Sequence, residues 1–437
     1  MVWQMLWVPG TRKALKEYAA LFKKDPNYSL WRLVKAMNLI IRKNKITRFG
    51  DDFLFAFIIP PISSPAFGNF LASARDQDKI FSSLAEQKKN APMTFSLALT
   101  DRCICQCWYC SNGDEKKPEL TTDQWKSLIS QIQKMGTSVI SFTGGEPLLR
   151  DDIEDLVRSV DERSQCFIYT SGWGLTLEKA ENLKACGLYG VSVSLDSAEP
   201  EVHIKHRGHP ESFEFACEAI KNASLAGLYP IVTAVLDRQQ LNKPSVLALA
   251  QMVETLGAQE LSLMEPIPVG RAAQDQDSRL FSAEDRKLLV DLQDWANKKL
   301  KLKVNTEILF YSDHLFGCAA GVQHSYLSSS GELYPCDFFQ ISFGNASKLP
   351  LAPLWRKMNA AMDQDVTLCL SGGTCDTQKT GGHHHNVNAC LTSGSCLDLP
   401  EGTDKSECIT HCLDKFHQNE PKFFKTLTGS KKVKAEV

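Results

Sequence analysis

Between residues 93 and 308, apolar stretches of strand length alternate with segments of helical periodicity. This alternation is typical of repeated βα units, in which parallel strands form one sheet and helices cover it. The units predicted here are too few for an eight-stranded barrel, so the sequence predicts an α/β fold built on a partial (β/α)6 barrel. Its strands are expected at Thr94–Thr100, Ser138–Phe142, Cys166–Thr170, Gly190–Leu195, Pro230–Leu236 and Glu260–Met264.

The helix expected after the first strand has signals at both ends. Thr121 or Thr122 can cap its start, and Gly136 can end it. One face of this helix is apolar, which predicts the side that packs on the sheet: Trp125, Leu128, Ile129, Ile132 and Met135.

Four loops that follow predicted strands have unusual sequences. Sheets of this class bind ligands at the carboxyl ends of their strands, so these loops are where chemistry is expected. They read TDRCICQCWYC, TGGEPLLR, TSGWG and SLDSAEP.

Composition limits the class of protein. The chain has 437 residues, 43% of them hydrophobic and 23% charged, with a formal net charge of -2 at pH 7, which argues against a protein built as a whole to bind nucleic acid. The longest apolar run, Phe53–Ile59, ends at Pro60 and is far shorter than the ~20 residues that span a bilayer. Without a recognisable secretory signal, the sequence favours a cytoplasmic protein.

The 15 cysteines are unevenly placed. In a reducing compartment, such cysteines are more often metal ligands than disulfide partners. Cys166, Cys186 and Cys217 lie among apolar neighbours and are interpreted as core residues. Four others fall within eight residues, at Cys103, Cys105, Cys107 and Cys110, and eight more follow residue 317.

The spacing of Cys103, Cys107 and Cys110 lets three thiolates from one loop converge on a single metal centre. Zinc prefers four ligands in a closed tetrahedron, commonly from two separate Cys-x-x-Cys pairs, and this loop has one such pair. An iron-sulfur cubane held by three thiolates keeps one iron open for an exchangeable ligand. Both alternatives remain open on the spacing alone.

These motifs resemble those of the radical S-adenosylmethionine (radical SAM) enzymes. The C-x3-C-x2-C loop with Tyr109 before its last cysteine follows the first strand, and the Gly144-Gly145-Glu146-Pro147 sequence follows the second. The resemblance covers roughly residues 93 to 310 and implies a 4Fe-4S cluster on Cys103, Cys107 and Cys110, with S-adenosyl-L-methionine (SAM) on its open iron. Cys105 falls outside the family spacing, and we expect its thiol to turn away from the cluster.

The resemblance also implies contacts to SAM, one of them from Tyr109 in the cysteine loop. Gly144, Gly145 and Glu146 would form the strip that binds the methionine amino group. Further contacts to the cofactor are expected from residues of the later loops: Thr170, Ser171, Ser194, Asp196 and Arg207. For Ser194 a structural role, and for Arg207 a surface salt bridge, are equally weighted alternatives.

The C-terminal part resembles the SPASM extension of peptide-modifying radical SAM enzymes. Cys318 and the Gly331-x4-Cys336 pattern carry this resemblance, although the later cysteine block departs from the family spacing. The resemblance implies one or two auxiliary 4Fe-4S clusters on the eight cysteines of this part: Cys318, Cys336, Cys369, Cys375, Cys390, Cys396, Cys408 and Cys412. The alternative is an extension held together by zinc or by disulfides. Asp337 matches the position of a proton-accepting aspartate in sulfatase-maturating relatives.

The regions outside the barrel differ in character. Residues 1–92 are interpreted as a basic, helical extension that could contact an anionic membrane surface on the cytoplasmic side. Residues 93–310 would form the radical SAM barrel, residues 311–420 an irregular Cys-rich domain, and residues 421–437 a basic tail.

The resemblance implies an oxidoreductase-like enzyme that cleaves SAM reductively to a 5'-deoxyadenosyl radical and abstracts hydrogen from a substrate carbon. In relatives with such an extension, the substrate is most often a peptide or protein side chain, which is oxidised, cross-linked or epimerised. A flavodoxin or ferredoxin would supply the electron. Two alternatives are radical modification of a lipid or other membrane-derived substrate, and a non-catalytic, zinc-stabilised interaction protein.

Overall fold

The computed structural model describes residues 9–26, 28–29, 31, 45–56, 58–73, 89–112, 118–274, 279–310, 319–339, 342–362, 374–375 and 385–386. Within these residues, the central element is a nine-stranded sheet with strand order β11-β10-β3-β4-β5-β6-β7-β8-β9. Its neighbouring strands pair in parallel, except for the β10–β11 pair. The strands are β3 (Thr94–Thr100), β4 (Val139–Gly144), β5 (Gln165–Thr170), β6 (Gly190–Ser194), β7 (Tyr229–Val235), β8 (Glu260–Met264), β9 (Lys303–Thr306), β10 (His324–Leu327) and β11 (Leu333–Tyr334).

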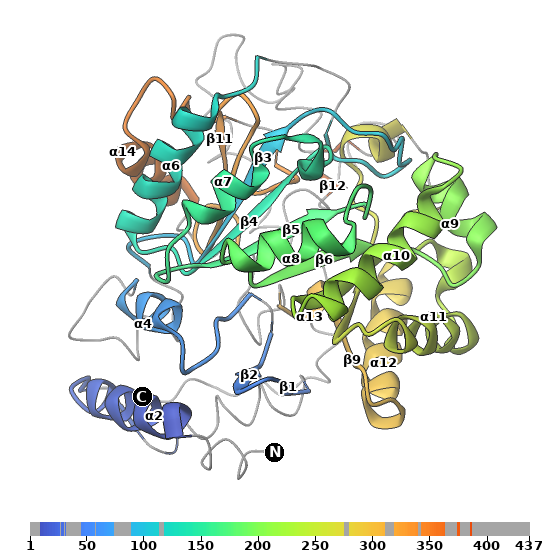
Figure 1. Cartoon of the computed structure of the whole chain (residues 1–437), viewed down its shortest axis with the longest axis horizontal. Coiled ribbons are helices and arrows are strands. Elements are labelled where there is room, and N and C mark those ends of the chain that lie inside the picture. The colour runs from blue at the N-terminus through green and yellow to red at the C-terminus, as the bar shows by residue number, and fades with distance from the viewer. Residues whose placement is uncertain are drawn as a thin grey trace.

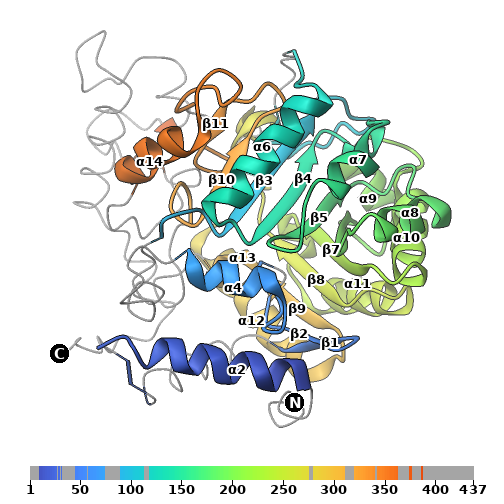
Figure 2. The same cartoon turned by 60° about the vertical axis from the view of Figure 1, so that its left-hand side comes forward.

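Helices cover one face of this sheet (Figures 1 and 2). The apolar residues of β3 point to this face, where Phe95 and Leu97 belong to the same buried cluster as Trp125. The helices that connect the strands are α6 (Thr122–Met135), α7 (Ile153–Arg158), α8 (Leu177–Ala185), α9 (Pro200–Arg207), α10 (Ser212–Leu225), α11 (Lys243–Thr255), α12 (Ala283–Lys299) and α13 (Glu307–Phe310), with short 3-10 turns η2 (Pro147–Leu149), η3 (Arg238–Gln240) and η4 (Gly270–Gln274).

The strand predictions are confirmed. The first and sixth predicted strands match β3 and β8 at both ends, and the other four differ by one or two residues at an end. Helix α6 has the expected caps: Thr121 forms a capping box with Gln124, and Gly136 ends the helix in the left-handed conformation. The sequence reasoning missed β9 and β10, which extend the sheet beyond the six predicted units at its two sides.

The face of the sheet opposite the helices carries small polar residues. Ser96 on β3, Ser141 on β4, Ser192 on β6 and Ser262 on β8 alternate with the apolar residues that pack on the helices, and all four are buried. This alternation gives the inner face of the sheet a hydrogen-bonding character.

The described part of the N-terminal region lies against the amino ends of the strands, below the sheet in Figure 2. It contains α2 (Pro9–Phe22), α4 (Pro65–Ala72) and an antiparallel hairpin of β1 (Thr47–Phe49) and β2 (Asp52–Leu54). We expected a helical region, and the hairpin shows that this expectation is wrong in part. Leu54 packs with Phe167 and Tyr229. The buried Lys303 ammonium donates to Phe55 O (2.9 Å) and pairs with Glu260 (3.1 Å). These contacts fasten the N-terminal region to the end of the sheet remote from the cysteine loop.

The described part of the C-terminal region continues the main sheet. β10 pairs in parallel with β3, and Trp355 on α14 (Leu351–Met362) donates to Ser325 Oγ (3.1 Å). A further pair, β12 (Thr374–Cys375) and β13 (His385–Asn386), is antiparallel. The division of the chain at residue 310 stays a prediction. Among the described residues, no helix is long and apolar enough to cross a membrane.

Candidate active site

The cysteine loop follows β3 at the carboxyl end of the sheet and is held by backbone hydrogen bonds. Gln106 N donates to Arg207 O (2.8 Å), and Trp108 N donates to His206 O (3.3 Å), so the loop lies against the end of α9. Arg271 N, in η4, donates to Cys110 O (3.0 Å). The loop is therefore fixed from both sides by elements that follow later strands.

The three predicted iron ligands occupy different environments in this loop. Cys103 is exposed, Cys110 is half-buried and Cys107 is buried. A hydrogen bond from Cys105 and the nearby Arg207 guanidinium lower the pKa of the Cys107 thiol to about 6, although burial opposes this. Burial raises the pKa of Cys110 to about 11. A hydrogen bond from Cys105 also lowers the pKa of Cys103, so both Cys103 and Cys107 favour the thiolate, which is the form that binds metal.

Cys105 does not turn away from the other sulfurs. Its buried thiol is hydrogen-bonded with the sulfurs of Cys103 and Cys107, which raises the pKa of Cys105. Our expectation about its direction is therefore wrong, because the one-residue spacing on each side keeps the thiol inside the loop. Among the described residues, no three His, Cys, Asp or Glu side chains form a group placed to hold a single metal ion.

The glycine strip crosses the backbone of the cysteine loop at close range. Gly145 N donates to Thr100 O and Glu146 N donates to Arg102 O, both at 2.7 Å. A Cβ atom on Gly144 would lie 2.3 Å from Thr100 O, and one on Gly145 would lie 2.1 Å from Arg102 O. Contact with the loop itself therefore requires both glycines, and Gly144 also has a φ of +119°.

Glu146 is fully buried and is surrounded by donors from the loop after β5. Its carboxylate accepts hydrogen bonds from Thr170 Oγ1 (2.8 Å), Ser171 N (2.7 Å) and Ser171 Oγ (2.5 Å). Burial raises the pKa of Glu146, while these hydrogen bonds oppose the rise. The Thr170 and Ser171 hydroxyls, which we predicted to contact the cofactor, are thus donors to Glu146 in this structure.

Tyr109, Asp196 and Arg207 form one chain of hydrogen bonds, in which Asp196 and Arg207 are buried and Tyr109 is half-buried. The Tyr109 hydroxyl donates to Asp196 Oδ2 and accepts from Arg207 Nη1, both at 2.7 Å. Asp196 Oδ1 also accepts from Val235 N (3.0 Å), so protein donors reach both carboxylate oxygens. Arg207 is buried and not a surface ion-pair residue, and its Nε has no partner among the described residues. Of these three side chains, Arg207 therefore has a donor left to contact the cofactor.

Ser194 ends β6 and is half-buried beside Thr233 of β7. It shares a face of the strand with Ser192, as predicted, and Ser192 Oγ is 2.6 Å from Thr233 Oγ1. Its position at the carboxyl end of β6 is compatible with the predicted contact, which stays a prediction.

Comparison with known proteins identifies one domain of this chain. The Radical SAM superfamily model matches residues 97–237, which contain the cysteine loop, the glycine strip and Asp196. The chain contains a radical SAM domain. This finding decides against the non-catalytic, zinc-stabilised alternative.

Similar proteins carry out different reactions. An AdoMet-dependent heme synthase of Nitratidesulfovibrio vulgaris is 26% identical over 285 residues, which are 59% of this chain and 77% of the relative. A PqqA peptide cyclase of Streptomyces rochei is 27% identical over 296 residues, or 63% of this chain and 80% of the relative. The crystal structure of Streptococcus suis SuiB bound to precursor peptide SuiA matches with a TM-score of 0.55 at 17% identity, covering 65% of this chain and 69% of SuiB. The last comparison shows the partial-barrel fold alone.

The family implies a 4Fe-4S cluster and SAM, and the residues present fit both. Three cysteines come from one short loop, and the glycine strip lies directly against that loop. The buried Arg207 Nε without a described partner is a donor suited to an anionic group of a ligand. These residues would hold the cluster and the cofactor side by side.

Asp337, the predicted proton acceptor, is paired with His324. Asp337 Oδ2 is 2.6 Å from His324 Nε2, and His324 Nδ1 is 2.7 Å from Thr94 Oγ1. Thr94 begins β3, whereas the cysteine loop follows its last residue, and a strand of this length spans roughly 20 Å. Asp337 is therefore anchored toward the opposite end of β3, and its catalytic role stays a proposal.

The predicted auxiliary-cluster cysteines are only partly described. Cys336 is half-buried and packs against the main core. Cys375 lies in β12, and nothing further is described for its side chain. The remaining predicted ligands lie outside the described residues: Cys318, Cys369, Cys390, Cys396, Cys408 and Cys412.

Sequence reasoning missed the polar residues that surround the start of the cysteine loop. Glu119 and Arg150 contact Leu99–Asp101 although they are 18 to 51 positions away in the sequence. Arg150 belongs to the TGGEPLLR loop that we singled out, but nothing local predicts its partners. His203 was also missed: its Nδ1 accepts from Asp196 N (3.0 Å).

We expect His203 to make the enzyme sensitive to acid. Burial lowers the pKa of His203 from 6.5 to about 4. Between these values the unfolded chain binds a proton that the folded chain does not, so stability is lost as the pH falls through this window. The loss between pH 7 and pH 5 should be about 2 kcal/mol larger for the wild type than for His203→Gln, measured by urea unfolding. Equal losses would contradict the prediction.

Proposed function

We propose that this radical SAM enzyme abstracts a hydrogen atom from a carbon of a peptide or protein side chain, leading to its oxidation, cross-linking or epimerisation. The observation that carries the radical step is the contact between the three-cysteine loop and the glycine strip at the carboxyl end of β3. When bound and reduced by one electron, the cluster and SAM supply a 5'-deoxyadenosyl radical and methionine.

Two kinds of similarity support a peptide substrate. One relative is a PqqA peptide cyclase, and the SuiB structure of similar fold was solved with a precursor peptide. The polar inner face of the sheet, with Ser96, Ser141 and Ser262, offers hydrogen-bonding groups of the kind that a peptide requires. The heme synthase relatives show that this sequence similarity extends to another substrate class.

The proposal gives the residues of the site separate tasks. Cys103, Cys107 and Cys110 hold the cluster, and the backbone of Gly144 and Gly145 binds the methionine part of SAM. Arg207, directed by Tyr109, pairs with an anionic group of the cofactor. Oxidation of the substrate radical also requires loss of a proton, which Asp337 accepts with His324 as its partner.

We extend the proposal to the electron supply. A flavodoxin or ferredoxin would deliver the electron to the cluster. One or two auxiliary 4Fe-4S clusters on the C-terminal cysteines, including Cys336, would accept the electron that substrate oxidation releases. The half-buried position of Cys336 beside Asp337 supports a coupled removal of proton and electron.

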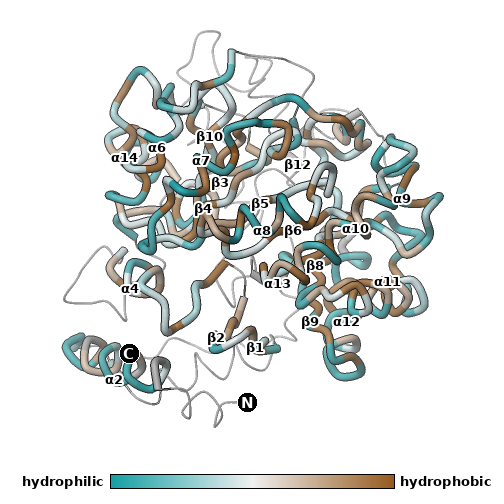
Figure 3. The backbone as a smooth tube through the Cα atoms, viewed as in Figure 1, coloured by the Kyte–Doolittle hydropathy of each residue, from teal (hydrophilic) through white to brown (hydrophobic). Residues whose placement is uncertain are grey.

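A lipid or other membrane-derived substrate is the second candidate, and α2 favours it. Hydrophilic and hydrophobic residues alternate along this helix (Figure 3). Ala14 and Tyr18 pack against the N-terminal hairpin region, whereas Arg12, Lys13 and Lys16 are exposed. Because the apolar side of the helix is already used in packing, the cationic side could hold an anionic membrane surface by electrostatic attraction.

The radical step has a direct test. After anaerobic reconstitution and reduction, the wild type should form 5'-deoxyadenosine from SAM, while the Cys103→Ala, Cys107→Ala, Cys110→Ala triple variant should form none and lose one cluster's share of iron. Chromatography of the nucleoside and iron analysis measure both quantities. Cys217→Ala is the matched control, since Cys217 lies on α10 and should leave both unchanged. Cleavage of SAM by the triple variant would contradict the assignment.

The substrate class can be tested by isotope transfer. A protein digest and a lipid extract from cells grown in heavy water are each added to the reduced enzyme with unlabelled SAM. Because the abstracted atom moves to the cofactor fragment, we expect deuterium in 5'-deoxyadenosine with the digest and none with the lipids, measured by mass spectrometry. Deuterium from the lipid extract alone would reject the peptide proposal and favour the second candidate.

A further inference from the structure

The segment Leu99–Arg102 leads from β3 into the cysteine loop, and its carbonyl groups are bound by the loop that follows β4. Arg150 Nη1 donates to Leu99 O (3.0 Å), and the glycine strip occupies Thr100 O and Arg102 O. Cys103 is the next residue along the chain. The position of the first predicted iron ligand therefore depends on contacts made by residues 145–150.

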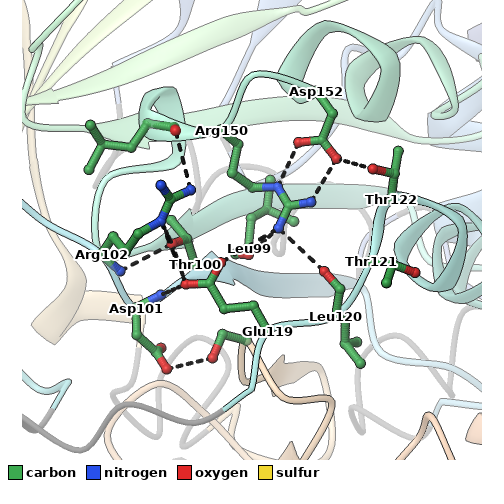
Figure 4. Close-up of polar contacts among 12 residues, drawn as sticks. Leu99, Thr100, Asp101, Arg102, Glu119, Leu120, Thr121, Thr122, Arg150 and Asp152 are labelled. Carbon is green, nitrogen blue, oxygen red and sulfur yellow. Dashed lines mark hydrogen bonds and ion pairs between the residues drawn. The ribbon is translucent and has the colours of Figure 1, made fainter.

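Glu119 binds the same segment from the other side. Its Oε1 accepts hydrogen bonds from Thr100 Oγ1 (2.6 Å) and from Asp101 N (3.1 Å). Arg102 Nε donates to Thr100 Oγ1 (3.3 Å) and lies 3.9 Å from Glu119 Oε1. Thr100, Arg102 and Glu119 thus form one connected group, in which the Glu119 carboxylate orients the Thr100 hydroxyl and pairs with Arg102 (Figure 4).

Arg150 joins the two ends of the cysteine-containing segment. The guanidinium forms a bidentate pair with Asp152 (2.7 and 2.6 Å) and donates to Leu120 O (3.4 Å) as well as to Leu99 O. Leu99 precedes the loop and Leu120 follows it. The Arg150 side chain is only 9% exposed, so its hydrogen bonds form away from competing water.

The C-terminal region also contacts the segment Leu99–Arg102. Ser329, in the turn after β10, donates from Oγ to Asp101 Oδ2 (2.6 Å) and accepts at its carbonyl oxygen from Leu120 N (2.8 Å). The segment before Cys103 is consequently held by three parts of the fold that are distant in sequence: residues 145–150, Glu119 and Ser329.

We propose that Glu119 is a positioning residue of the radical SAM site. Together with the contacts of Arg150, it sets the segment before Cys103 against the glycine strip and thereby aligns the first iron ligand with the strip that binds the methionine part of SAM. The inference rests on the proposed function, because it assumes that the loop holds a cluster and that SAM binds it. Neither residue is expected to touch the cluster, the cofactor or the substrate.

The test uses the anaerobically reconstituted full-length enzyme with four variants. Glu119→Ala removes the acceptor, and Thr100→Val removes the hydroxyl that donates to it while keeping a similar side-chain shape. Glu119→Gln retains an oxygen that can accept both hydrogen bonds. The matched control is Asp155→Ala, on the exposed surface of α7. It removes an ion pair with Arg158 whose length, 2.6 Å, equals that of the hydrogen bond between Thr100 and Glu119.

The readouts are iron content, and the SAM concentration that produces half of the change in the electron paramagnetic resonance spectrum of the reduced cluster. Glu119→Ala and Thr100→Val should each raise this concentration about tenfold, as expected when a hydrogen bond that orders the site is lost. Glu119→Gln should stay within about threefold of the wild type, since its oxygen restores the acceptor. Asp155→Ala should match the wild type in both readouts.

Each result decides the inference. Wild-type half-saturation in both Glu119→Ala and Thr100→Val would overturn it, as would a Glu119→Gln variant as impaired as Glu119→Ala. If Glu119→Ala fails to fold, Thr100→Val still decides. A wild type whose cluster spectrum does not respond to SAM would instead refute the proposed function, and with it this inference. That outcome is distinguished by the wild-type titration alone.

Discussion

The close backbone contact between the cysteine loop and the glycine strip is the constraint on which this site depends. Thr100 O and Arg102 O are each bound by an amide of the strip, and a side chain at Gly144 or Gly145 would collide with the same two oxygens. Because β3 and β4 are neighbouring parallel strands, their carboxyl ends bring these segments together without any long connection. The fold thereby places the cysteine loop directly beside the glycine strip.

The surrounding elements hold the cysteine loop and the glycine strip in place. α9 and η4 bind the second half of the cysteine loop, while Glu146 ties the glycine strip to the loop after β5. The Tyr109 hydroxyl links the loop to Asp196 and Arg207. Glu146, Asp196 and Arg207 are bound by residues from other parts of the chain, so the site is a product of the assembled sheet and not of one motif.

Local patterns in the sequence predicted much of this arrangement. Alternating polarity identified β3 and β8 at both ends, and the Thr121 and Gly136 signals identified the ends of α6. The partners of Glu119 were not predictable, because nothing in its own neighbourhood records which strand end it meets. The direction of the Cys105 thiol was predicted wrongly for a related reason: family spacing identifies the ligands but does not describe how a further sulfur packs between them.

Edge strands show the same limit. β10 joins the sheet beside β3 although more than 200 residues separate them, and its short sequence lacks a helical unit of the kind that revealed the other strands. This pairing carries Ser329 to the cysteine loop and His324 to Thr94. The C-terminal region is thus part of the environment of the site, which the division into a barrel and an extension did not anticipate.

We propose that three sulfurs hold the cluster, so that one iron remains available to SAM while Cys105 stays a packing residue. Electron-nuclear double resonance of the reduced enzyme with SAM labelled by 15N in its amino group tests this most directly. We expect a coupling between the cluster and the labelled nitrogen in the wild type and in Cys105→Ala alike. No coupling in the wild type, with coupling appearing in Cys105→Ala, would show that the fourth sulfur closes the cluster and would contradict the three-sulfur assignment.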